Sequence, residues 1–513
     1  MRTQGLVSKR TMAVGRNFVA NSVNQGVSFL ANIIAVPIYL SQLGIEQYGL
    51  VGFAIVVQTW INLLEFGMSG TLGREMTRFK IGDVSESSVH SFVRSLDWLF
   101  FGAAIALPAI GWLGRGFWAQ QWFTTHTLAP RVINESVVLI IALAAVRLAG
   151  TLYRGGLMGL DRQVFVSALS VASSVLRLVL PLPFIWKNPD VRIIIGAWLL
   201  VSIVELVVLR VSLSRVFSTR FRWRHFSLSE VRDRAHLWGR IAYLAVIWTA
   251  ISQTDKLILS RVLSLADYGK FTLVMILSNA ILTISSPINF AFQPPMTAAA
   301  TRGNRQELAA LVGNSARLMM ILIVAPAFAL AAVPALAITG WTGHAAAAAD
   351  ATAYLGPYVI GSAFAGCVSV VYLIQYAFGD LRLQVRAFTV LGAILIPGEI
   401  IVATRFGPLG ASWLWFTVNI LSLLIYCPIV FHHFLPGETK RWLGLIIAGP
   451  ALASGAAAWA IGLLIDGHAA NRLHAIFWTA LTVLAACAAA AAVTLFLAFR
   501  ERRRLLAPEL GVS

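Results

Sequence analysis

Fourteen apolar stretches of about twenty residues follow one another along the chain, separated by short segments rich in charge, Gly or Pro. A helix of about twenty apolar residues spans the hydrocarbon core of a bilayer. Hydrophobic residues make up 58% of the 513 positions and charged residues only 12%, which lies far from the composition of soluble domains. The sequence therefore predicts an all-α polytopic membrane protein with 14 transmembrane helices.

The predicted spans and the charges between them also give a topology. Most Lys and Arg residues lie in alternate loops, on the side of the N-terminus, so the positive-inside rule places both termini in the cytoplasm. The predicted spans cover residues 17–39, 48–68, 94–113, 132–153, 164–186, 191–213, 241–263, 270–291, 314–337, 353–377, 386–404, 411–434, 442–465 and 475–499.

The net charge of +18 is spread over these loops rather than gathered in one patch. The largest share lies in the link from Arg210 to Arg240, which we interpret as a topology anchor that touches anionic lipid headgroups. Nucleic-acid binding is not expected. The three cysteines each fall inside an apolar run, so we predict packing residues and no disulfide framework.

Part of the sequence repeats at an offset of 220 residues. Tyr48-Gly49 recurs as Tyr268-Gly269, and Gly159 with Arg162 recurs as Gly379 with Arg382. Because each repeat holds an even number of spans, the copies are predicted to be parallel six-helix repeats that form two lobes around a central cavity. The predicted domains are an N-lobe (1–213), a basic cytoplasmic linker (214–240), a C-lobe (241–434), and two accessory C-terminal spans with a basic tail (435–513).

Polar residues form a stripe along the first span. Their spacing of four, three, four and four residues places them on one helical face, which is expensive to expose to lipid. Hydrogen bonding between helices explains any single amide, whereas five positions on one line favour a hydrated cavity. The stripe consists of Asn17, Asn21, Asn24, Ser28 and Asn32.

Three arginines within or next to spans are candidate anion ligands. Arg147 and Arg154 are seven residues apart, on the same face of the fourth span, and Arg177 lies in the fifth. A guanidinium group binds phosphate oxygens through two parallel donors. Pairing with a neighbouring helix, or snorkelling in the case of Arg154, is the structural alternative.

The acidic residues inside spans are Glu65, Glu205, Asp255 and Glu399, and Lys256 directly follows Asp255. The candidates for coupling transport to protons or ions are Asp255, Glu205, Lys256 and Glu65. Adjacent helix positions point about 100° apart, so we expect that Asp255 and Lys256 do not form one simple pair and that at least one of them has a partner elsewhere. A structural ion pair is the alternative to a coupling role.

Motifs of enzymes are missing from the sequence. It contains no Walker loop, no HExxH and no CxxC pair, and His432-His433 has no third metal ligand nearby. We therefore predict a transporter without catalytic residues, cofactor or metal.

Several short motifs share a pattern: the stripe from Asn17 to Asn24, Leu43-Gly44 with Tyr48-Gly49, Glu65-x-Gly67 leading to Arg74, and Asp255-Lys256 through Tyr268-Gly269. This pattern resembles the polysaccharide-export flippases of the multidrug/oligosaccharidyl-lipid/polysaccharide exporter superfamily, which translocate O-antigen and exopolysaccharide repeat units. The resemblance implies two lobes around a cationic cavity, two extra C-terminal helices, and translocation of undecaprenyl-diphosphate-linked sugars across the bacterial inner membrane.

We predict that the diphosphate meets Arg74, Arg147, Arg154 and Arg177, and that the sugars meet the polar stripe of the first span. Membrane lipids and a polysaccharide polymerase are the expected partners of a monomeric protein. The alternative is a cation-coupled multidrug antiporter of the same superfamily, which would favour acids over arginines and end after twelve spans. A scaffold or lipid-modifying enzyme would need acids or histidines clustered in an aqueous loop, and the long loops here are basic.

Overall fold

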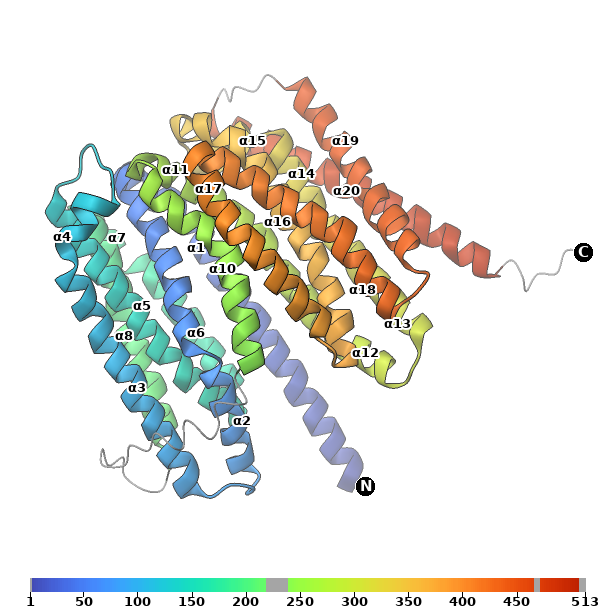
Figure 1. Cartoon of the computed structure of the whole chain (residues 1–513), viewed down its shortest axis with the longest axis horizontal. Coiled ribbons are helices and arrows are strands. Elements are labelled where there is room, and N and C mark those ends of the chain that lie inside the picture. Colours follow the sequence, from blue (N-terminus) through green and yellow to red (C-terminus); the bar gives the residue numbers. More distant parts are fainter. Residues whose placement is uncertain (1, 218–238, 466–470, 507–513) are drawn as a thin grey trace, which may run out of the picture. The chain divides into compact units, whose positions relative to one another are not determined.

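The computed structural model describes residues 2–217, 239–465 and 471–506. These residues are nearly all helical, and one isolated β-bridge, between Thr124 and Ser264, is the strand-like pairing within this part of the chain. The chain divides into two compact units, unit 1 (Met1–Gly269) and unit 2 (Lys270–Ser513) (Figure 1). The prediction of an all-α membrane protein is confirmed.

Eleven helical segments in the described residues are long and apolar enough to cross a membrane. The two longest, Val23–Glu65 and Arg382–Phe434, each contain two of the predicted spans. Gly44 (φ 73°) and Gly407 (φ 60°) break them with backbone conformations that favour glycine. The predicted seventh span corresponds to α10 (Gly239–Val262), which is not among the eleven. Each predicted span thus falls on a helix, and the count of fourteen stays a prediction.

Unit 1 is built around α5, which is apolar on most of its faces and therefore becomes a buried helix. It packs against α8, α2, α3 and α1. Leu96, Leu152 and Leu209 are among the side chains of the core between these helices. The unit contains α1 (Arg2–Asn62), η1 (Leu63–Glu65), α2 (Met68–Lys80), α3 (Glu86–Leu113), α4 (Arg115–Phe117), η2 (Trp118–Trp122), α5 (Pro130–Gly159), α6 (Gln163–Val179), α7 (Leu182–Ile185), α8 (Val191–Ser214), α10 and the start of α11 (Leu265–Thr283).

Small residues let α2 and α5 approach very closely. A Cβ atom at Gly159 would lie 2.0 Å from the carbonyl oxygen of Gly73, and one at Gly155 would lie 2.3 Å from that of Ser69. The hydroxyl of Thr77 donates to the Gly159 carbonyl at 2.9 Å across the same contact. Such spacing of small residues is typical of membrane helices that pack backbone to backbone.

A second close contact in unit 1 joins α1 to the start of α11. A Cβ atom at Gly49 would lie 2.4 Å from the Leu265 carbonyl oxygen, and one at Gly269 would lie 2.2 Å from that of Ile45. The two contacts are related by the offset of 220 residues found in the sequence, since 45 and 49 correspond to 265 and 269. The repeated Tyr-Gly pairs therefore meet each other at equivalent positions, which explains why neither glycine tolerates a side chain.

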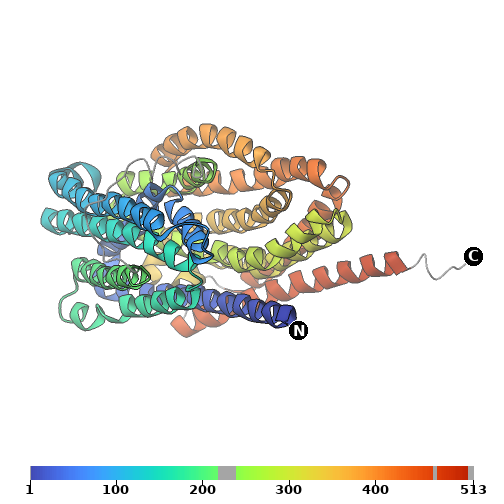
Figure 2. The same ribbon diagram turned by 90° about the horizontal axis from the view of Figure 1, so that it is seen from below.

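Unit 2 has α16 as its buried helix, packed against α12, α14, α15 and α17. The helices α19 and α20 pack on each other and on α14, with Ala329, Ala458 and Ala486 fully buried between them. The last turns of α20 extend beyond the other helices of this unit (Figure 2). The unit contains the rest of α11, α12 (Ser285–Thr301), α13 (Arg305–Met319), η3 (Met320–Val324), α14 (Ala325–Ala332), α15 (Pro334–Thr342), α16 (Ala345–Phe378), α17 (Arg382–Leu421), η4 (Ser422–Tyr426), α18 (Cys427–Phe434), η5 (Arg441–Ala448), α19 (Gly449–Leu464) and α20 (Arg472–Leu506).

The predicted lobes and linker stay a prediction. Most of the predicted basic linker, residues 218–238, lies outside the described residues, as do residues 466–470 and 507–513.

Candidate functional site

A carboxylate in unit 1 lies between two arginines from different helices. Glu205 of α8 is 4% exposed and accepts a hydrogen bond on each of its oxygens. Arg154 of α5 donates to Oε1, and Arg177 of α6 donates to Oε2 at 2.7 Å. The same Arg177 nitrogen lies 3.2 Å from the hydroxyl of Ser202, one turn before Glu205. One acid thus joins α5, α6 and α8.

The position of Arg177 depends on a proline four residues later. Pro181 has no N–H group, so the Arg177 carbonyl loses its usual helical donor. Two side chains replace that donor: the hydroxyl of Tyr39 at 2.8 Å and the indole N–H of Trp198 at 3.1 Å. The end of α6 is therefore held from α1 and α8, and this fixes the direction in which the Arg177 side chain leaves the helix.

Arg147, two turns before Arg154 on α5, adds a third cation. It donates to the amide oxygen of Gln58 on α1, and its charge interacts with those of Arg154, Arg177 and Glu205. Arg147, Arg177 and Glu205 each lie about 12 Å or more from the nearer end of their span, given a rise of about 1.5 Å per residue. We call these residues, Gln58, Arg147, Arg154, Arg177 and Glu205, the charged cluster. Its three guanidinium groups face one carboxylate.

The polar stripe on α1 meets the charged cluster through α6. Ser28 shares a hydrogen bond of 2.8 Å with Ser174, which precedes Arg177 by three residues and so lies on the same face. The Ser28 hydroxyl also lies 3.4 Å from the amide oxygen of Asn24. Asn32 is exposed and donates to the Ser28 carbonyl of its own helix, and Asn21 is exposed. The side chain of Asn17 lies outside the described residues.

Two other predicted site residues are Glu65, which ends η1, and Arg74, in the middle of α2. Glu65 accepts from the backbone N–H of Ser69 at 3.2 Å and from its hydroxyl, so it caps α2. Arg74 is exposed on α2. No hydrogen bond joins either residue to the charged cluster in the described part of the chain, so the structure does not bring them together with Arg147.

Asp255 and Lys256 pair with each other although they are adjacent, and Lys256 also has the second partner that we expected. The Lys256 ammonium lies 3.2 Å from Asp255 Oδ1 and also donates to the carbonyl of Ser252 on the same helix. The long, flexible stem of lysine overcomes the 100° between adjacent positions. Both side chains are nearly buried, at 13% and 5% exposure, and belong to α10. They form an ion pair within one helix.

The sequence analysis missed a second buried polar group in unit 1. The hydroxyl of Tyr153 donates to Asp97 Oδ1 at 2.5 Å, and Arg210 lies 3.6 Å from Oδ2. On α3, Arg94 lies 3.3 Å from His90. Asp97 falls inside a predicted span and could have been noted as an intramembrane acid. Its partners come from α5 and α8, and the sequence does not reveal which helix faces meet.

The buried polar groups of unit 2 are mostly neutral. Gln375 donates to Gln384 at 3.1 Å and to the hydroxyl of Tyr426 at 2.5 Å, and its own oxygen accepts from the Gln384 backbone. Asn289 donates to Ser369 at 2.8 Å. Among the described residues of this unit, Glu399 is the buried side chain that carries a charge.

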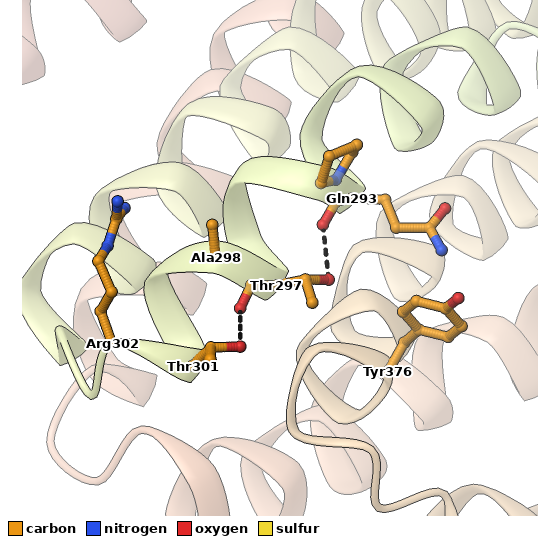
Figure 3. A pocket seen from close by; sticks show the side chains of 7 residues that line it. Gln293, Thr297, Ala298, Thr301, Arg302 and Tyr376 are labelled. Carbon is orange, nitrogen blue, oxygen red and sulfur yellow. Dashed lines mark hydrogen bonds between the residues drawn. The ribbon is translucent and has the colours of Figure 1, made fainter. Parts of the chain in front are cut away.

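An open surface pocket of about 620 Å³ also lies in unit 2, between α12 and α16 (Figure 3). The hydroxyls of Thr297 and Thr301 donate hydrogen bonds to backbone carbonyls of α12, and Arg302 pairs with Glu307 at 2.8 Å. Gln293 and Tyr376 complete the wall. Because its polar groups are largely committed to the protein, we do not assign it a ligand.

No family model and no curated protein matches the sequence. The fold, however, is similar to that of solved membrane transporters of the MOP superfamily. The chain is similar to the lipid II flippase MurJ in an inward closed conformation, with a TM-score of 0.71 and 12% identity, over 95% of this chain and 99% of that one.

Two further solved structures extend the comparison. An inward-facing multidrug resistance MATE transporter of the MOP superfamily gives a TM-score of 0.60 and 17% identity over 79% of this chain and 95% of that one. A MOP superfamily transporter from Pyrococcus furiosus, described as having a binding pocket of reverse polarity, gives a TM-score of 0.55 and 16% identity. That similarity covers 83% of this chain and 96% of the other. At these identities the similarity concerns the fold.

Proposed function

We propose that the protein is a flippase that moves undecaprenyl-diphosphate-linked oligosaccharide repeat units from the cytoplasmic to the periplasmic leaflet of the bacterial inner membrane by alternating access. Both termini would lie in the cytoplasm. Delivery of the units to a polysaccharide polymerase, and action as a monomer, belong to the same proposal.

The observation that carries this proposal is the charge balance of the charged cluster. Three guanidinium groups and one carboxylate leave an excess of two positive charges inside the spans of unit 1. Intramembrane cations are costly and are retained where they bind a partner of opposite charge. A diphosphate supplies that charge, together with several oxygens suited to guanidinium donors.

The fold supports a cargo that is partly lipid. The similarity to the lipid II flippase covers 95% of this chain and 99% of that one, whereas the similarity to the MATE transporter covers 79% of this chain. A lipid-linked sugar diphosphate needs a polar path for its headgroup and an apolar environment for its tail. Such a fold could provide both.

Within this proposal each predicted residue has a role. Arg147, Arg154 and Arg177 bind the diphosphate, and Arg74 meets it as it enters from the cytoplasm. The stripe of Asn17, Asn21, Asn24, Ser28 and Asn32 binds sugar hydroxyls. Glu65, Glu205, Asp255 and Lys256 are the candidates for coupling, and retained transport in both Asp255→Asn and Glu205→Gln proteins would exclude the two acids from that role.

The test is a translocation assay in proteoliposomes. Fluorescent undecaprenyl-diphosphate oligosaccharide is scored by its accessibility to an external glycosidase, and efflux of a cationic dye is followed in parallel. We expect movement of the lipid-linked sugar and no dye efflux. Dye efflux alone would contradict the proposal and indicate the alternative, a cation-coupled multidrug antiporter.

A further inference from the structure

The bonding of Glu205 leaves donors of the charged cluster unused. Arg154 and Arg177 each contact the carboxylate through one terminal nitrogen. Their Nε atoms are buried and have no hydrogen-bond partner among the described residues. A guanidinium group carries five N–H donors, and its preferred partner engages two in parallel. Arg154 and Arg177 therefore hold Glu205 in a geometry that leaves each arginine with unused donors for a second anion.

The exposure of these side chains differs in a way that suits such an exchange. The Glu205 side chain is 4% exposed, Arg177 is 15% exposed and Arg154 is 33% exposed. Both arginines are therefore more accessible to an incoming anion than Glu205, and Arg154 is the most accessible of the three. Two guanidinium groups with no counter-charge inside a membrane protein would be strongly unfavourable, so an empty site needs this carboxylate.

We propose that Glu205 is an internal counter-anion that competes with the cargo for Arg154 and Arg177. This inference rests on the proposed function and adds how the cargo is released. When the site is empty, Glu205 neutralises the two arginines. A phosphate group of the cargo takes over part of these hydrogen bonds, and Glu205 regains them when the cargo leaves. Because one anion replaces another, binding stays weak enough for release, as transport requires.

The test measures binding of geranyl diphosphate, a short prenyl diphosphate, to purified full-length protein by calorimetry. In Glu205→Gln the competitor is lost while the side-chain shape is kept. We expect the Kd to fall about tenfold or more, which corresponds to about 1.4 kcal/mol. The flipping rate should fall in the same variant, because release slows. Glu205→Asp, which keeps the charge, should restore most of the wild-type Kd.

Two controls separate this effect from general changes. Glu135→Gln removes a carboxylate that pairs with Arg131 and Arg192 at the other end of α5, and it should leave the Kd unchanged. If Glu205→Gln does not fold, the comparison is made in the background of Arg154→Gln, because the double variant has then lost one charge of each sign. The double variant should bind geranyl diphosphate more tightly than Arg154→Gln alone.

An unchanged or higher Kd on removal of Glu205, in either background, would overturn the inference. That result differs from failure of the proposed function, which would show as wild-type protein that neither binds the prenyl diphosphate nor flips the lipid-linked sugar.

Discussion

The interiors of the two units differ in charge although the sequence repeats between them. Positions 147, 154, 177 and 205 carry the ionisable residues of the charged cluster, and 220 residues later the chain has Cys367, Ile374, Pro397 and Ile425. Cys367 and Ile374 are fully buried. The polar network nearby in unit 2 is made of amides and a phenol, through Gln375, Gln384 and Tyr426.

The two units therefore differ in the kind of polar group that they bury. A charge inside a membrane protein needs a partner, so it is retained only where a helix face supplies one. Unit 1 concentrates cations whose buried Nε donors are unused, whereas the buried polar side chains described in unit 2 are mostly neutral. We therefore expect an anionic cargo to depend on unit 1 far more than on unit 2.

The largest effect should come from removing the arginines of the charged cluster. Arg147→Ala and Arg177→Ala should each reduce the initial rate of lipid-linked sugar flipping by about 10- to 100-fold, because each hydrogen bond to a charged group contributes about 1.5–3 kcal/mol. Arg131→Ala changes the same residue type on α5 at a side chain that is 83% exposed, and it should flip normally. Normal flipping by folded and inserted Arg147→Ala and Arg177→Ala proteins would remove the anionic-headgroup proposal.

Placing a charge in unit 2 should show that its interior has no matching partner. Cys367→Arg puts a guanidinium at the position that corresponds to Arg147, and we expect a loss of about 3 kcal/mol in stability. Thermal unfolding in detergent measures it, with Cys367→Ser as the control of small volume and no charge. A stable Cys367→Arg protein would show that unit 2 accommodates a cation as unit 1 does.

The two glycines at equivalent positions 159 and 379 should respond differently. Gly159→Ala forces a Cβ against the Gly73 backbone and should cost about 1–3 kcal/mol. Gly379 has open space but φ 70°, so Gly379→Ala should cost about 1 kcal/mol through backbone strain. Asn tolerates that backbone conformation, so Gly379→Asn should cost less stability than Gly379→Ala. Asn is larger than Ala, so Gly159→Asn should cost more stability than Gly159→Ala. Equal effects at both sites would contradict these separate causes.

The neutral network of unit 2 should matter for stability more than for transport. Gln375→Ala leaves the backbone N–H of Gln384 without its acceptor and removes one donor from the Gln384–Tyr426 pair, so it should cost about 1–3 kcal/mol, with a flipping rate close to wild type. Gln293→Ala, at the surface pocket, is the matched control and should change neither. A flipping defect in Gln375→Ala as large as that of Arg147→Ala would mean that both units bind the cargo directly.

The smallest effect should appear at the start of α8, where unit 1 has Asp190 and the equivalent position in unit 2 is Gly410. Burial alone would raise the pKa of Asp190, but hydrogen bonds from the Arg192 side chain and backbone lower it below its usual 3.8. A lowered pKa contributes stability above pH 3.8 that is lost as the pH falls through the lowered value. Asp190→Asn keeps the helix cap and should weaken this acid-side dependence in thermal unfolding.

The helices could be predicted because each span is a continuous apolar run, and the breaks at Gly44 and Gly407 fall between predicted spans. The faces of α5 could be predicted from the spacing of Arg147 and Arg154. Their partners could not, because Gln58 and Glu205 come from other helices and periodicity within one helix does not say which neighbour it meets. Asp97 shows the same limit, and Asp255 with Lys256 shows that side-chain length can override helical geometry.

The central claim is that the charged cluster of unit 1 recognises the negative charge of the cargo. The most direct measurement compares, in the same proteoliposomes, the flipping of an undecaprenyl-diphosphate oligosaccharide with that of an uncharged prenyl glycoside carrying the same oligosaccharide. We expect wild-type protein to flip the diphosphate lipid only, and Arg147→Ala to lose that preference. Equal flipping of the charged and uncharged lipids by wild-type protein would contradict the claim.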